Sequence, residues 1–179
     1  MEGRDFVKKP AMAGCAVAAQ DSLAPGCGMR YVCTGEVHRD FHASTLDCVN
    51  YLVDNYGEDA ARTVLERTGK EVYRQMHCKL VAGDTSELLE WWRYYLAREG
   101  GGFDIDERAD GTATLTVHDC PALRHLVRRG ISGGKRTCWA TKVLNESLCD
   151  GSPFEIVLEE TGDFSCRQTL RKKAPTTTH

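Results

Sequence analysis

Two short polar segments of the chain carry the residue types best suited to chemistry. In the first, His-Arg-Asp-Phe-His, the side chains of His38, Asp40 and His42 stand at every second position. An extended segment presents all three on one face, and a helix still presents the two histidines together. Two imidazoles with a carboxylate suit a divalent metal such as zinc, or a general acid/base site. We therefore predict a metal site of His38, Asp40 and His42, or catalytic roles for Asp40 and His42, with a polar helix cap as the simpler interpretation.

The second segment, His118-Asp119-Cys120-Pro121, is predicted to lie at a corner between a strand and a helix. Residues i and i+2 of a strand point to one face, so we expect His118 and Cys120 to face the same side. A cysteine at the start of a helix has its thiolate favoured by the helix dipole. Cys120 is therefore predicted to be a nucleophile or soft metal ligand and His118 a catalytic partner, with an inert packed thiol as the alternative. We expect this corner to face His42 across one pocket.

Three further side chains are predicted to bind a substrate. The guanidinium of Arg167 suits a carboxylate, which it can hold through two hydrogen bonds. Trp92 belongs to a segment rich in aromatic residues, which predicts either core packing or an aromatic wall around a small ligand. Asn145 is one of several polar candidates, with Arg124 and His125, and each of these is equally typical of a solvated surface.

Apolar residues at helical spacing predict the helices that must position these groups. Their predicted bounds are residues 43–56, 58–80, 86–98, 121–129 and 138–148. Gly57 ends the first helix, and Gly69 predicts a kink or break in the second. The third follows a capping sequence that begins at Asp84.

Alternating apolar residues in the second half of the chain predict two hairpins. In the first, strands within residues 103–117 flank Asp110-Gly111, a strong turn signal. In the second, strands over residues 153–158 and 164–170 flank Thr161-Gly162-Asp163. Helices followed by hairpins indicate an α+β fold, with N-terminal helices packed on a small, mainly antiparallel four-stranded sheet and two further helices.

The length of 179 residues, with 41% hydrophobic and 27% charged content, fits one globular domain. We predict a flexible N-terminal segment over residues 1–35, a single domain over 36–172 and a disordered tail over 173–179. The net charge of −3 makes nucleic acid an unexpected partner. No apolar stretch is long enough to span a membrane, and residues 12–20 are too short for an export signal, so we expect a cytoplasmic protein.

The nine cysteines include no Cys-x-x-Cys pair. This absence argues against a zinc ribbon, an iron–sulfur cluster and a thioredoxin-like redox site. In a cytoplasmic chain the number of cysteines indicates free thiols, metal ligands or a nucleophile. Cys48 and Cys78 fall inside helical patterns and are expected to be small core residues.

Several short motifs together resemble the bacterial family of L-2-amino-thiazoline-4-carboxylic acid hydrolase-like proteins. They are H-x-D-F-H (38–42), Tyr56-Gly57, Val72-Tyr73, the Trp-bearing segment before Glu99-Gly100-Gly101, H-x-C-P-A (118–122), Cys138, Asn145 and G-x-x-x-C (162–166). The likeness covers about residues 36–172. It implies hydrolysis of a non-peptide C–N bond in a small cyclic amidine, opening a thiazoline-carboxylate ring. The His/Asp/Cys site would supply an activated water or thiolate and a proton donor, with or without a metal.

Two other classes of function stay open at this point. Cys120, Cys138 and Cys166 beside aromatic helices favour a non-catalytic sensor domain that binds a metal or small molecule, similar in layout to vinyl-reductase-type domains. A structural or assembly protein is the third class, in which the helix with Trp91 and Trp92 forms the interface of a homo-oligomer. In the first two classes the partner is a small-molecule substrate or ligand.

Overall fold

The computed structural model describes residues 41–174, so His38 and Asp40 lie outside the described part of the chain. The helices of this part are α2 (Phe41–Tyr56), α3 (Glu58–Arg67), the π-helical turn η1 (Thr68–Val72), α4 (Arg74–Val81), α5 (Ser86–Arg98), α6 (Pro121–Arg128) and α7 (Gly134–Leu148). The strands are β1 (Gly102–Glu107), β2 (Ala113–Asp119), β3 (Phe154–Gly162) and β4 (Ser165–Lys172). They form one antiparallel sheet in the order β1-β2-β4-β3. The predicted α+β fold is confirmed.

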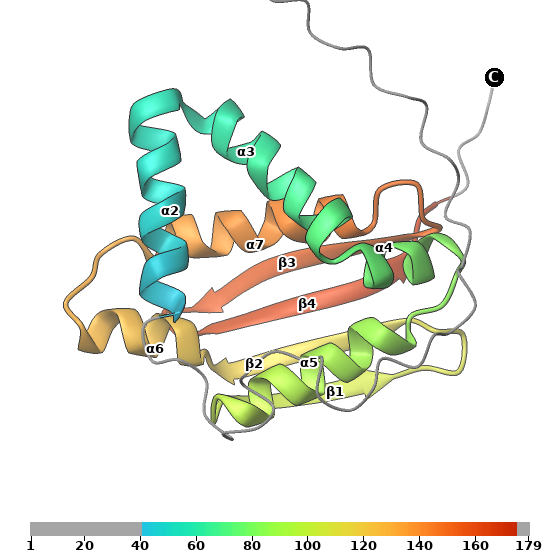
Figure 1. Cartoon of the computed structure of the whole chain (residues 1–179). Coiled ribbons are helices and arrows are strands. Elements are labelled where there is room, and N and C mark those ends of the chain that lie inside the picture. Colours follow the sequence, from blue (N-terminus) through green and yellow to red (C-terminus); the bar gives the residue numbers. More distant parts are fainter. Residues whose placement is uncertain (1–40, 175–179) are drawn as a thin grey trace, which may run out of the picture.

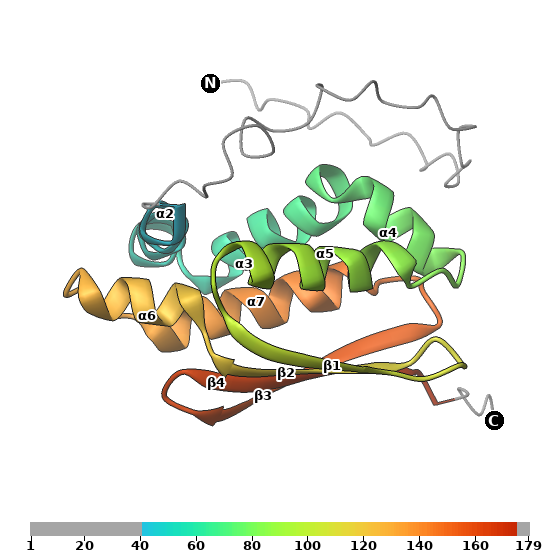
Figure 2. The same cartoon turned by 90° about the horizontal axis from the view of Figure 1, so that it is seen from below.

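The helices of residues 41–174 all lie on one face of the sheet (Figure 2). We call this the helical face and the opposite one the polar face. Strand alternation places one cross-strand row under the helices, consisting of Ile105, Leu115, Gln168 and Leu158. The adjacent row on the polar face consists of Asp104, Thr116, Arg167 and Glu159. The sheet therefore separates apolar from charged side chains by a simple period of two.

The core lies between α5, α7 and the helical face of the sheet (Figure 1). Helix α5 begins where predicted, because the Asp84 carboxylate accepts a hydrogen bond of 2.9 Å from the backbone N–H of Ser86. Its apolar stripe reaches the sheet through Leu88, Trp92 and Leu96, and Trp92 is only 2% exposed. Trp92 is thus a core residue, and its predicted role in binding a substrate is wrong.

The predicted second helix is broken near Gly69, as expected, into α3, η1 and α4. A Cβ atom at Gly69 would lie 2.6 Å from the Ser147 hydroxyl oxygen on α7. That hydroxyl donates a 2.6 Å hydrogen bond to the backbone carbonyl of Glu66. Because Gly69 has no Cβ atom, the π-helical turn η1 can approach α7 more closely than it could with any other residue at this position.

Both hairpins form where the turn signals predicted them. In the first, the Asp110 carboxylate accepts a 3.0 Å hydrogen bond from the backbone N–H of Thr112, and Gly111 has a φ of 82°. The second extends beyond its predicted end, since Lys173 donates from its backbone N–H to the carbonyl of Pro153 at 2.8 Å. The start of the predicted disordered tail is therefore held in place at Lys173.

Two further expectations concern the helices. Cys48 is exposed on α2, so its predicted place in the core is wrong, whereas Cys78 on α4 is half-buried. The helical period alone does not distinguish the buried flank of a short amphipathic helix from its exposed flank. Among residues 41–174, no helix combines the length and apolar character needed to cross a membrane.

Candidate functional site

A buried histidine–carboxylate pair joins the start of α2 to the end of α5. The Nε2 atom of His42 lies 2.6 Å from the Oε2 atom of Glu99, and the two side chains are 14% and 4% exposed. The pair forms where the first turn of α2, which contains His42, meets the end of α5, which Glu99 directly follows. A carboxylate this deeply buried requires such a partner, and the pair is the centre of the site.

Two more titratable side chains pack around His42. The His125 ring lies 6.2 Å from the His42 ring, and the Tyr95 ring lies 6.4 Å from it, measured between centroids. Burial is the main cause that raises the pKa of Tyr95, and the charge of Glu99 raises it further. Tyr95 therefore keeps its O–H at neutral pH and can donate a hydrogen bond.

An aromatic wall extends from Tyr95 along α5. Its ring stacks on Trp91 with centroids 5.1 Å apart and planes 16° apart, and Trp91 meets the edge of Tyr73 at 6.1 Å. Positions 91, 95 and 99 are each one turn apart, so Glu99 continues the same stripe of the helix. Trp91 and Tyr95 therefore form an aromatic stripe on α5, and the aromatic wall around a small ligand stays a prediction.

Two buried polar atoms next to His42 lack hydrogen-bond partners in the part of the chain that the structure describes. They are the Oε1 atom of Glu99 and the Nε2 atom of His125. Leaving such an atom unpaired costs about 1–3 kcal/mol, so proteins almost always satisfy it with protein, water or ligand. The cluster thus holds one carboxylate oxygen and one imidazole nitrogen that have no hydrogen-bond partner among residues 41–174.

Cys120 lies beside these groups as the N-cap residue of α6 and packs against the core. Burial raises the pKa of its thiol, and the charge of Glu99 adds to the rise. Backbone N–H groups of Leu123 and Ala122 lower the pKa, as the helix dipole predicts, but they only partly offset the burial. The prediction that Cys120 is a thiolate is therefore wrong, because its raised pKa keeps the thiol neutral at neutral pH. His42, Tyr95, Glu99, Cys120 and His125 are called the His42 cluster below.

Cys138 on α7 and Cys166 on β4 lie close enough to Cys120 for a charge on Cys120 to raise their pKa values. Burial raises the pKa of Cys138 to about 11 and that of Cys166 to about 12. These thiols are thus uncharged at neutral pH, whereas a cysteine that binds a metal does so as a thiolate. Within residues 41–174 no group of three or more His, Cys, Asp or Glu side chains is arranged to hold a metal ion. Because His38 and Asp40 lie outside this range, the metal site predicted with His42 stays a prediction.

His118 does not join the cluster. Its Nε2 atom lies 2.7 Å from the Oδ2 atom of Asp104 on the polar face, where these side chains are 56% and 82% exposed. Cys120 packs toward the helical face, so the prediction that it shares a face with His118 is wrong. The alternation applies only inside a strand, and β2 ends at Asp119, where the chain turns into α6.

Arg167 and Asn145 also lie away from the His42 cluster. Arg167 is on the polar face, where its guanidinium is 3.9 Å from the Glu159 carboxylate. Asn145 is buried and donates a 2.8 Å hydrogen bond from Nδ2 to Oε1 of Gln168, which ties α7 to β4. The structure therefore places Arg167 on the face of the sheet opposite His42, and it engages the Asn145 amide with Gln168.

The sequence patterns missed Glu99 and Tyr95. The stripe at positions 91, 95 and 99 was visible as helical spacing, and it marks one flank of α5. No local pattern links that stripe to His42, since the two contacting residues are 57 positions apart.

Two surface pockets lie elsewhere. One, of about 380 Å³, runs between α7 and β3, and the other, of about 630 Å³, lies between α2 and the start of α7. In the second, Arg136 is bound by Asn50 at 2.8 Å and by Asp54 at 3.2 Å. Neither pocket is lined by a residue of the His42 cluster. We place the candidate site at the cluster because the convergent buried polar groups are there.

Comparison of the chain with models of protein families, with curated proteins and with solved structures found no match.

Proposed function

We propose that this protein is a small-molecule hydrolase that acts on a non-peptide C–N bond of a cyclic amidine, such as a thiazoline carboxylate. The observation that carries the proposal is the buried His42–Glu99 pair, with its 2.6 Å contact. The substrate class comes from the resemblance of the sequence motifs to the thiazoline-carboxylate hydrolase-like family. The supporting geometry is the gathering of the Tyr95 phenol and of two unpaired polar atoms around His42.

In this mechanism His42 is the general base. When its Nε2–H donates to Glu99, the lone pair of Nδ1 is free to accept a proton from water. The carboxylate then holds the imidazole in one orientation and stabilises the imidazolium that forms. The water oxygen forms a bond to the amidine carbon as its proton passes to Nδ1.

The leaving nitrogen needs a proton when its bond to the carbon breaks. The imidazolium of His42 can supply the proton that it took from water, and the protonated phenol of Tyr95 can donate a hydrogen bond to that nitrogen. His42 is neutral again after this transfer, so that the net reaction consumes one water. The free Oε1 atom of Glu99 can accept an N–H bond from the amidine, which orients the ring.

Cys120 is a neutral neighbour in this scheme, because burial raises its pKa. We further propose a cytoplasmic location, where a reducing environment would preserve the free thiols of the described cysteines.

The test compares two histidine–carboxylate pairs of the same chain. Purified full-length protein is given 2-aminothiazoline-4-carboxylate, and the ring-opened product is followed by chromatography. Glu99→Gln and His42→Gln should lower kcat/KM by about a hundredfold or more. Asp104→Asn and His118→Gln alter the exposed pair on the polar face and should leave kcat/KM unchanged. Circular dichroism establishes that each variant is folded.

Absence of turnover by the unmodified chain would overturn the proposal for this substrate. Equal turnover by the folded Glu99→Gln variant and the unmodified chain would remove the pair from the mechanism.

A non-catalytic ligand-binding domain is the second candidate. The neutral thiols of Cys120, Cys138 and Cys166 and the wall of Trp91 and Tyr95 favour it, because they suit binding better than nucleophilic attack. Saturable quenching of tryptophan fluorescence by the same compound, without formation of product, would support this candidate over the hydrolase.

A further inference from the structure

Arg98, the last residue of α5, has one edge of its guanidinium group without a partner. Its Nη1 atom donates a 2.8 Å hydrogen bond to the Tyr94 hydroxyl oxygen, and the guanidinium carbon lies 5.4 Å from the centre of the Tyr94 ring. Its Nε and Nη2 atoms are buried and have no hydrogen-bond partner among residues 41–174. Because a guanidinium is a permanent cation, its burial without a counter-charge is unfavourable. The open edge is therefore suited to bind an anion.

The two open atoms define which anion fits. The N–H groups of Nε and Nη2 point in the same direction, so together they can bind both oxygens of one carboxylate. Arg67 shows this geometry in the same chain, because its Nε and Nη2 atoms donate to the two carboxylate oxygens of Glu71 at 3.1 and 3.0 Å. Arg98 presents the same edge without a carboxylate from the described part of the chain.

Glu99 adds an unpartnered group of opposite charge. Its Oε1 atom is buried without a partner within residues 41–174, while its Oε2 atom contacts His42. Consecutive helical residues point about 100° apart, so Arg98 and Glu99 do not face each other. Tyr95 precedes Arg98 by three positions and Glu99 by four, which makes it a neighbour of both on the helix surface. The open cation and the open carboxylate oxygen therefore flank Tyr95.

The open edge of Arg98 lies near the surface of the protein. Arg98 as a whole is half-buried, and Tyr94 beside it is 49% exposed. Neither side chain belongs to the apolar core between α5 and the sheet. A small molecule can therefore reach the edge by displacing surface groups, without opening the core.

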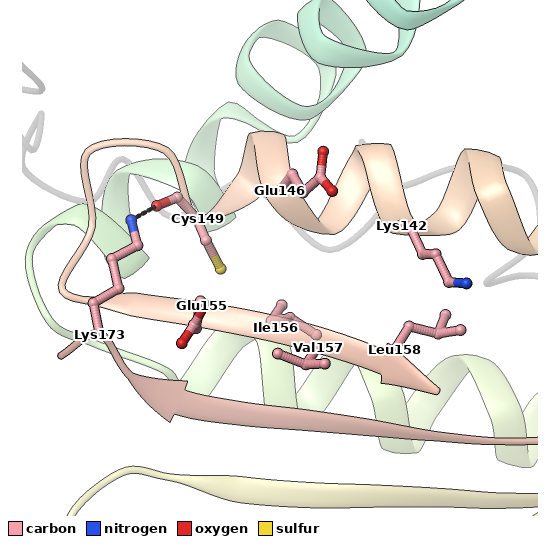
Figure 3. Close-up of a pocket in the computed structure, with 8 residues that line it drawn as sticks. All are labelled: Lys142, Glu146, Cys149, Glu155, Ile156, Val157, Leu158 and Lys173. Atoms are coloured by element: carbon pink, nitrogen blue, oxygen red, sulfur yellow. Dashed lines mark hydrogen bonds between the residues drawn. The ribbon is translucent and has the colours of Figure 1, made fainter. Parts of the chain in front are cut away.

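The groove between α7 and β3 offers a contrast (Figure 3). None of the described residues that line it has a buried side-chain nitrogen or oxygen without a partner. Lys173 donates to the Cys149 carbonyl at 2.8 Å, as the dashed line in the figure marks. The other charged side chains of the groove, each with a charged partner at 2.9 to 3.2 Å, are Lys142, Glu146 and Glu155. Open buried groups of both charges thus distinguish the end of α5 from this groove.

We propose that Arg98 binds the carboxylate of the substrate and that the site takes a zwitterionic small molecule, whose cationic nitrogen group binds Oε1 of Glu99. This assignment rests on the proposed function. In 2-aminothiazoline-4-carboxylate, a protonated amidine and a carboxylate stand on the two carbons that flank one ring nitrogen. Binding of both groups places the amidine beside Glu99, the partner of His42. Arg98 thereby takes the role that the sequence predicted for Arg167, which lies on the polar face.

A change of the ligand and of the arginine together tests the assignment. Isothermal titration calorimetry of the full-length protein compares 2-aminothiazoline-4-carboxylate with its uncharged 4-carboxamide. The unmodified chain should bind the carboxylate more tightly by about tenfold to a hundredfold, and Arg98→Gln should abolish that preference. Arg98→Lys should keep part of it, because an ammonium retains the charge but not the two-point geometry. Arg167→Gln is the matched control and should keep the full preference.

An unchanged preference in Arg98→Gln, with the variant folded by circular dichroism, would overturn the assignment, and so would failure of the unmodified chain to bind the carboxylate compound. Binding that depends on Arg98 without any turnover would contradict the hydrolase and keep the carboxylate site. Turnover with the same KM in Arg98→Gln and the unmodified chain would keep the hydrolase and remove Arg98 from it. The expected kinetic result is a rise in KM that exceeds the fall in kcat.

Discussion

His42 and Glu99 form a buried pair at 2.6 Å, whereas His118 and Asp104 form an exposed pair at 2.7 Å on the opposite side of the sheet. The two pairs have similar geometry and the same chemical groups. Their surroundings differ, because the first pair is enclosed by α2, α5 and α6 and the second faces outward from β1 and β2. A buried pair is shielded from competing water, so only the first is placed to control a bound molecule.

Substitution of the two neighbouring tryptophans of α5 should affect different properties, ligand binding for Trp91 and stability for Trp92. Trp91→Leu should weaken ligand binding, because Trp91 stacks on Tyr95, and should cost little stability. Trp92→Leu should lower the free energy of unfolding by about 2–4 kcal/mol, because Trp92 is 2% exposed in the core. Urea denaturation and fluorescence titration with 2-aminothiazoline-4-carboxylate measure the two effects. A larger loss of stability for Trp91→Leu would show that the two faces of α5 are assigned wrongly.

Asn145 should matter for stability and not for binding. Asn145→Ala removes the 2.8 Å hydrogen bond to Gln168 and leaves a polar group unpaired in the interior. We expect the free energy of unfolding to fall by about 1–3 kcal/mol, measured by urea denaturation. The double variant Asn145→Leu with Gln168→Leu should recover part of the loss, since neither polar group then remains. A change in ligand affinity without a change in stability would restore the role predicted from sequence.

Gly69 should be intolerant of any side chain. Gly69→Ala would place its Cβ atom 2.8 Å from that of Ser147, so we expect a loss of about 1–3 kcal/mol in thermal or urea unfolding. Gly102→Ala is the comparison, because the nearest atom to a Cβ there is 3.6 Å away. Replacing Ser147 by glycine in the Gly69→Ala background should recover part of the loss. Equal stability of Gly69→Ala and the unmodified chain would mean that α3 and α7 separate readily.

The buried thiols should make the fold sensitive to alkaline pH. Burial raises the pKa of Cys138 and Cys149 to about 11 and of Cys166 to about 12, above the value of about 8.5 for an unfolded thiol. The folded chain therefore holds these protons at pH values where the unfolded chain has lost them. Their contribution is complete below pH of about 8.5 and decreases as pH rises toward the folded-state values.

Urea denaturation under reducing conditions at pH 8 and at higher values measures this slope, which is at most about 1.4 kcal/mol per pH unit for each thiol. Cys166→Ala should flatten the slope. Cys48→Ala changes an exposed thiol and should leave the slope as it is. A stability that does not change from pH 8 upward would contradict the burial of these side chains.

Much of the fold could be predicted because it follows from local rules. The Asp84 carboxylate accepts from the Ser86 N–H where α5 begins, Asp110-Gly111 turns the first hairpin, and Gly69 marks the break between α3 and α4. Each of these features depends on residues within a few positions of one another. Alternation also predicted the strands, although it failed one residue after β2, where Cys120 leaves the strand to cap α6.

The sequence by itself determined the order and type of the elements, since caps, turns and periodicity act over short distances along the chain. Only the tertiary structure decided which polar groups meet. It paired His42 with Glu99, which lies 57 positions away, and it set His118 and Arg167 on the other face of the sheet. It also reversed the expected pKa shift of Cys120, because the cost of burying a thiolate exceeds the stabilisation by two backbone N–H groups.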